Sequence, residues 1–114
     1  ILEMSTPVVK IWEKIILLPL VGVLDSTRAK QMMESLLNAI ETNQAKVAIL
    51  DISGIPVIDT LVARHLFATI AAVKLMGSDC IVTGISAKIS QTIVHLGLDL
   101  SAITTKTALA DGLK

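Results

Sequence analysis

A short run of aliphatic residues, Val47–Leu50 within the stretch KVAILDIS, constrains the possible fold most strongly. A strand with one wet face alternates apolar and polar residues, whereas an uninterrupted apolar strand is typical of a sheet covered on both faces. Helical periodicity of apolar residues precedes this run over Thr27–Glu41, and a second helix is predicted after it, over about Thr60–Met76. The run is therefore predicted to be a central strand of a sheet that packs against helices.

The flanking segments predict shorter elements. Two apolar segments, Val8–Ile11 and Ile15–Val23, are separated by Glu-Lys and predict a hairpin, and DCIVTG predicts another buried strand. A third helix over Ile89–Leu96, capped by Ser86, precedes a short strand in LSAIT and a terminal helix over Thr107–Leu113. The predicted fold is α/β, with helices packed against a mixed, mostly parallel sheet in the order β-β-α-β-α-β-α-β-α.

The predicted helices indicate which side chains face the core. These are apolar residues three or four positions apart along each helix, and they are Met32, Leu36, Leu66, Ile70, Val73 and Ile93. Asp25 or Ser26 is available to cap the first helix, and Gly77 to end the second. The 114 residues are enough for one core, so residues 1–114 are predicted to form a single domain. The start at Ile1, without an initiator Met, suggests excision from a longer protein.

Composition narrows the classes of partner. Ten basic and ten acidic residues give a formal charge of zero, which lacks the basic surface of a binder of nucleic acids or anionic membranes. The uncharged run Ile15–Leu24 is far shorter than the roughly 20 residues that span a bilayer. Cys80 is the only cysteine, which fits a reducing, cytoplasmic compartment. With 53% hydrophobic residues and no net charge, the domain is expected to self-associate, at least as a dimer.

Catalytic and cofactor-binding patterns are not found in the sequence. His65 and His95 both fall within predicted helices, where surface or partly buried roles are expected, and Cys80 is expected to be a small core residue. The chain contains no zinc-binding spacing, nucleophile elbow or phosphate-binding loop, so neither enzymatic activity nor a cofactor or metal is predicted. Asp51 follows a central strand, as the acceptor of receiver domains does. The acidic pair that those domains carry after the first strand is missing here.

One polar cluster, in DISGIPVIDT, stands out from the apolar chain. Asp59 is a good N-cap, which places Thr60 in the first turn of a helix, where backbone N–H groups are unpaired and the dipole is positive. A phosphate on a hydroxyl held there is electrostatically tolerated. The alternative is purely structural: Asp59 and Thr60 cap the helix, while Gly54 and Pro56 shape the turn that leads into it.

The sequence resembles the STAS domain of anti-sigma-factor antagonists. The resemblance lies in DISGIPVIDT, in LMGSDCIVTGISAKISQTIVHLGLDL and in LPLVGVLDSTRAKQMMESLL, and it covers nearly the whole chain. It is strongest to the carboxy-terminal domain of RsbR-type stressosome proteins. The resemblance implies that Thr60, next to Asp59, is phosphorylated by a switch kinase of the RsbT type. Asp59, Ser53 and Gly54 are expected to cap the helix and to face the partner.

The resemblance also implies a role for the whole domain. In the family it is a non-catalytic docking module that assembles with RsbS-type partners into a stressosome, from which amino-terminal sensory domains project, and it regulates stress-response signalling. RsbR-type proteins carry a second phosphoacceptor threonine, and Thr92 is the candidate here. A structural role, with the Thr92 hydroxyl bonded back to the preceding turn, is an equal alternative. Other functions known for STAS domains are one-to-one antagonism of an anti-sigma kinase, regulation of an anion transporter, and small-molecule binding.

Overall fold

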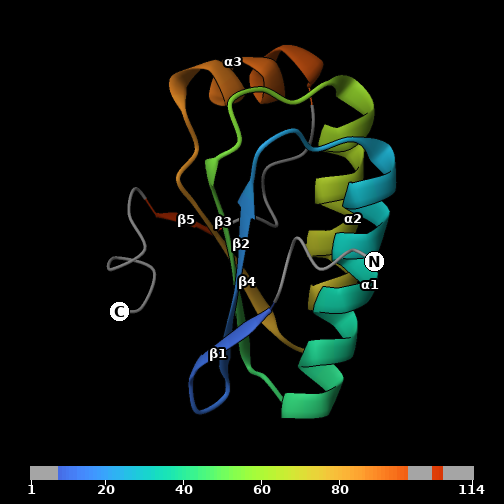
Figure 1. Ribbon diagram of the computed structural model, residues 1–114, viewed down its shortest axis with the longest axis vertical. Coiled ribbons are helices and arrows are strands. Elements are labelled where there is room, and N and C mark those ends of the chain that lie inside the picture. The colour runs from blue at the N-terminus through green and yellow to red at the C-terminus, as the bar shows by residue number, and fades with distance from the viewer. Residues whose placement is uncertain (1–7, 98–103, 107–114) are drawn as a thin grey trace.

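The computed structural model describes residues 8–97 and 104–106, and within them five strands form one mixed sheet (Figure 1). The strands lie side by side in chain order, and only the first pair is antiparallel. Their bounds are β1 Val9–Trp12, β2 Ile15–Val21, β3 Val47–Gly54, β4 Asp79–Thr83 and β5 Thr104–Lys106. The prediction of a mixed, mostly parallel sheet with β3 at its centre is confirmed.

Three helices complete the described part of the fold: α1 Ser26–Asn43, α2 Thr60–Leu75 and α3 Ala87–Leu96. Figure 1 shows α1 and α2 side by side on one face of the sheet, with α3 across the end where the parallel strands finish. Among the described residues, no helix is long and apolar enough to cross a membrane. The predicted terminal helix over residues 107–113 and most of the predicted strand in LSAIT lie outside the described residues.

The ends of α1 show how local chemistry fixes the length of a helix. Asp25 is the N-cap, since its Oδ1 accepts a hydrogen bond of 2.8 Å from the N–H of Arg28. At the other end the helix continues two residues beyond the predicted Glu41, and Gln44 takes a left-handed conformation with φ of 53°. Glycine usually occupies such a position, so a glutamine there carries no local signal for the end of the helix.

The core lies between the sheet and the two long helices. Alternate residues of β2 and β3 point toward α1 and α2, and the helices contribute apolar residues one turn apart. All six predicted core residues are buried. The opposite face of the sheet carries Leu17, Ile49 and Ile81 in one cross-strand row. Ile49 on that face and Leu50 on the core face are both fully buried, which explains why β3 reads as an uninterrupted apolar run.

Candidate functional site

Asp59 and Thr60 begin α2 in the arrangement that the sequence predicted. Asp59 has an extended backbone, and its Oδ1 accepts a hydrogen bond of 2.8 Å from the N–H of Val62. Its carbonyl accepts the first intrahelical bond, 3.0 Å long, from Ala63. Thr60 is the first residue of α2 and is exposed. The side chain of Asp59 therefore forms the helix cap, whereas the side chain of Thr60 is accessible to solvent.

A short, anchored loop carries Thr60 to the surface. It leaves β3 through a turn in which the N–H of Ile55 donates to the carbonyl of Ile52 over 3.0 Å. Ile55 and Ile58 are buried in the core, while Pro56 and Val57 between them are exposed. Two apolar anchors three residues apart thus restrain the loop from below and leave its outer side free.

Gly54 has a second role besides the predicted one. It is the last residue of β3 and a central residue of the turn that the Ile55–Ile52 hydrogen bond closes, and its φ is not positive. A Cβ at this position would lie 2.6 Å from Cγ1 of Val21 and 3.0 Å from the carbonyl oxygen of Leu20, both on β2. Glycine is required here because β2 passes too close for a side chain, a reason that the sequence pattern does not show.

The Asp51 carboxylate, near the end of β3 and just before this loop, accepts several hydrogen bonds. Thr83 Oγ1 donates to Asp51 Oδ1 over 3.1 Å, and Ser53 donates its hydroxyl to Oδ2 over 3.1 Å and its N–H to Oδ1 over 3.3 Å. Gly84, with φ of 77°, leaves space for these hydrogen bonds, since a Cβ at position 84 would lie 2.5 Å from the Cβ of Ser53. Ser53, a predicted partner-facing residue, is exposed but tied to Asp51. The carboxylate thus holds β3 to β4, a role that the sequence analysis missed.

The two candidate phosphoacceptors line the same surface hollow. This open depression of about 530 Å³ lies between the start of α2 and one side of α3. Its lining combines the helix start with a row of α3 side chains, and consists of Ile58, Asp59, Thr60, Lys88, Gln91, Thr92, His95 and Leu96. Thr60 and Thr92 are 32 positions apart in the sequence, so no local pattern could have placed them together.

Thr92 is held more firmly than Thr60. Its Oγ1 donates to the carbonyl of Lys88 over 3.1 Å, which is the bond to the preceding turn that the sequence analysis proposed as an alternative. The Thr92 side chain is half-buried. Both ends of α3 are capped. Ser86 caps the start by accepting from Ile89 over 3.1 Å, and Gly97 ends the helix with φ of 70°. Phosphorylation of Thr92 would have to break an existing hydrogen bond.

Exposed apolar side chains surround the Thr60 loop. Val57 is 49% exposed and Leu61 54% exposed, and they lie three residues before Thr60 and one after it. Isolated exposed aliphatic residues are ordinary on protein surfaces. These two flank an exposed hydroxyl, so they offer apolar contact area to a protein that docks at Thr60.

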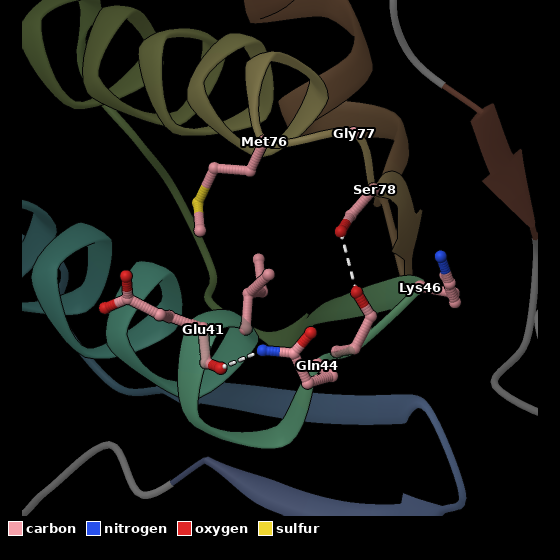
Figure 2. Close-up of a pocket in the computed structure, with 8 residues that line it drawn as sticks. Glu41, Gln44, Lys46, Met76, Gly77 and Ser78 are labelled. Atoms are coloured by element: carbon pink, nitrogen blue, oxygen red, sulfur yellow. Dashed lines mark hydrogen bonds between the residues drawn. The ribbon is translucent and has the colours of Figure 1, made fainter.

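A second hollow, of about 210 Å³, lies at the opposite end of the molecule, where α1 and α2 finish (Figure 2). Two of its polar side chains donate to backbone carbonyls. The buried hydroxyl of Ser78 donates to the carbonyl of Ala45 over 2.7 Å, and the Gln44 amide donates to the carbonyl of Glu41 over 3.0 Å. These bonds stabilise the two turns at this end.

The other predicted chemical groups are the two histidines and the cysteine. His65 is half-buried on α2, whereas His95 is exposed on α3 and lines the hollow beside Thr60. Cys80 is buried in β4, and burial raises the pKa of its thiol to about 12, while nearby Lys74 opposes the rise. Within residues 8–97 and 104–106 no three His, Cys, Asp or Glu side chains are grouped closely enough to hold a metal ion.

Comparisons with known proteins agree with this geometry. The family model of the STAS domain matches residues 6–112. The RsbT co-antagonist protein RsbRA of Bacillus subtilis is 45% identical over 112 residues, which cover 98% of this chain but only 41% of that relative. A solved variant of RsbS from Moorella thermoacetica has a TM-score of 0.82 at 30% identity, with 95% of this chain and 91% of that chain covered.

A chain of the solved stressosome, described as a signal integration and transduction hub, has a TM-score of 0.75 at 29% identity. The match covers 94% of the present chain and 92% of the stressosome chain. The fold and the match of the family model over residues 6–112 agree with one another. The chain therefore belongs to the STAS domain family, and RsbR-type RsbT co-antagonist proteins are among its homologues.

Proposed function

We propose that this chain is a non-catalytic docking module for a switch kinase of the RsbT type, and that phosphorylation of Thr60 controls the docking. The observation that carries the proposal is the accessible Thr60 hydroxyl at the capped start of α2, on a loop fixed by two buried isoleucines. The similarity to RsbT co-antagonist proteins supports the choice of kinase. In the proposed reaction, Oγ1 of Thr60 loses its proton to the medium and bonds to the γ-phosphorus of ATP, while the bond from that phosphorus to the β–γ bridging oxygen breaks and ADP leaves.

The electrostatics of α2 support a modification that changes the surface and leaves the fold intact. A phosphate adds about −1.5 to −2 charges at neutral pH. The helix dipole favours an anion at its start by roughly 0.3–1 kcal/mol, whereas the Asp59 carboxylate repels it. A kinase packed on Val57 and Leu61 would have to bury a dianion beside apolar side chains, which is costly without a paired cation. Phosphorylation is therefore expected to weaken docking.

We further propose that the domain assembles with an RsbS-type STAS paralogue and with copies of itself in a cytoplasmic stressosome. The similarity to solved RsbS and stressosome chains supports this assembly. Thr92 is proposed as a second phosphoacceptor, slower than Thr60 because its hydroxyl already donates to Lys88. In the longer protein, an amino-terminal sensory domain would supply the signal.

The decisive experiment combines phosphosite mapping with measurements of kinase binding. The chain is incubated with an RsbT-type kinase and ATP, sites are mapped by mass spectrometry, and kinase affinity is measured calorimetrically for wild type, Thr60→Ala, Thr60→Asp and Thr92→Ala. Thr60→Ala should lose most of the incorporated phosphate, and Thr60→Asp should bind the kinase at least tenfold more weakly. Thr92→Ala should keep the kinase affinity and lose only the smaller, slower part of the phosphate. Thr42→Ala, measured alongside, is the matched control: it removes an exposed threonine near the end of α1 and should keep both properties.

The proposal fails if Thr60→Ala is phosphorylated as fully as wild type and Thr60→Asp binds the kinase equally well. Thr60 would then be only a helix-start residue. The stoichiometry from the same calorimetry, with sedimentation of the domain mixed with RsbS, separates a multi-copy scaffold from a one-to-one antagonist. A scaffold should sediment with RsbS as a complex larger than either protein alone.

A further inference from the structure

The wall of the hollow that faces Thr60 is a single face of α3. Lys88, Thr92 and His95 follow one another at spacings of four and three residues, which places them one above another on a helix. Lys88 and His95 are both exposed and both line the hollow. An ammonium group and an imidazole therefore stand across the hollow from the Thr60 hydroxyl.

The charges near the hollow are not balanced by one another. Asp59 is the only carboxylate in its lining, and its Oδ1 already accepts the capping bond from Val62. Among the described residues, Lys88 and His95 take part in no ion pair. Lys88 can swing its three N–H donors on a flexible four-carbon stem, and an imidazole offers an N–H donor in either protonation state. A phosphoryl group presents three strong acceptor oxygens to such donors.

We propose that Lys88 and His95 capture the phosphoryl group of phosphorylated Thr60 within the same chain. The biological use of this contact rests on Thr60 being the phosphoacceptor, as proposed above. Capture would bridge the start of α2 to α3 and fill the hollow. It would also neutralise Lys88, so that a partner loses a free cation on α3 when it meets a new anion on α2. Phosphorylation would then change the charge on both walls of the hollow, on α2 and on α3, and not at Thr60 alone.

The test uses the chain with phosphothreonine installed at position 60 during translation, so that no kinase is needed. Phosphorus-31 NMR follows the second ionisation of the phosphate between pH 4 and 9 in this protein and in its Lys88→Gln, His95→Ala and Lys88→Arg variants. A nearby cation favours the dianion and lowers the pKa of the phosphate. We expect that pKa to rise by about 0.5 or more in Lys88→Gln, by less in His95→Ala, and to stay low in Lys88→Arg, which keeps the charge.

Lys74→Gln is the matched control, because Lys74 lies in the last turn of α2, about 20 Å from Thr60 at 1.5 Å per residue. It should leave the phosphate pKa unchanged. Equal pKa values in wild type, Lys88→Gln and His95→Ala would overturn the capture. A kinase that ignores Thr60 would refute the proposed function, yet the installed phosphate would still decide the capture, so the two failures are distinguishable.

Discussion

Leu36 shows at the scale of one residue how strongly the core depends on aliphatic packing. It is fully buried in α1, within a core that contains no aromatic side chain with complete burial. Leu36→Ala is expected to lower the free energy of unfolding by about 2–5 kcal/mol, because it removes buried methyl groups and leaves a cavity. Urea denaturation followed by circular dichroism measures this loss.

Leu75 provides the matched control for Leu36. It is the same residue type in a neighbouring helix, but its side chain is 89% exposed. Leu75→Ala should change the free energy of unfolding by no more than about 0.5 kcal/mol. Equal losses for the two variants would mean that α1 does not bury Leu36 as the structure shows.

The residues at the site differ in how far the sequence predicted them. Asp59 and Thr60 were placed correctly, because a capping aspartate acts on amides two or three residues away and so leaves a local signature. The hydrogen bonds around Asp51 leave no such local signature. Its partner Thr83 is 32 residues away in the sequence, and only the parallel register of β3 and β4 brings the two side chains together. That Thr60 and Lys88 line one hollow depends in the same way on the packing of α3.

At the scale of the elements, helices and buried strands were predictable and their ends were not. Periodicity is repeated over a whole helix, so α1 and α2 were placed within two residues of their observed bounds. β3 was predicted over Val47–Leu50 but continues to Gly54. Its second half carries the polar Asp51 and Ser53, which remain in the strand because each has a hydrogen-bond partner. Sequence pattern alone cannot show those partners.

The close approach of β2 and β3 yields a prediction at this scale. Gly54→Ala would place a Cβ 3.1 Å from Cα of Val21 and 3.0 Å from the carbonyl of Leu20, and backbone atoms cannot move aside cheaply. We expect a loss of about 1–3 kcal/mol in the free energy of unfolding, typical of overpacking. Thermal and urea unfolding measure it.

Two variants identify the cause of the Gly54 effect. Gly54→Ala combined with Val21→Ala removes the contact with Cγ1 and leaves the backbone contacts, so most of the loss should remain. Gly77→Ala provides a contrast, since nothing lies within 4 Å of its Cβ and only its φ of 86° is unfavourable. If Gly54→Ala were as stable as wild type, the close approach of the two strands would be wrong.

At the scale of the whole molecule, the two ends of the sheet handle polar groups differently. Where α1 and α2 finish, hydrogen bonds join three turns. The backbone N–H of Lys46 donates to the carbonyl of Lys14 over 2.7 Å, and the backbone N–H of Asp79 donates to the carbonyl of Lys46 over 2.9 Å. The Ser78 hydroxyl donates to the carbonyl of Ala45. Where the parallel strands finish, the Thr60 hydroxyl and Lys88 face solvent. One end is thus closed by its own hydrogen bonds, and the other presents groups to a partner or a phosphate.

Cys80 reports on the integrity of the whole molecule. It lies in β4 on the core face of the sheet, paired with Ala48, and is 1% exposed. Burial raises the pKa of the thiol from 9.0 to about 12, with Lys74 acting in the opposite direction. Below pH 9 the thiol is protonated in both the folded and the unfolded chain, so it adds no pH dependence there. Between pH 9 and 12 the unfolded chain loses this proton and the folded chain keeps it, which favours unfolding.

The stability of the wild type should therefore fall as pH rises above 9, with a contribution from Cys80 of up to about 1.4 kcal/mol per pH unit. Urea denaturation under reducing conditions at pH 8, 9, 10 and 11 measures the fall, and Cys80→Ala separates it from the titration of lysines. The variant should be less stable at pH 8, because it loses packing, yet its stability should decline less steeply above pH 9. Parallel declines for the two proteins would show that the thiol ionises as readily in the folded chain as in the unfolded one, which contradicts the burial of Cys80.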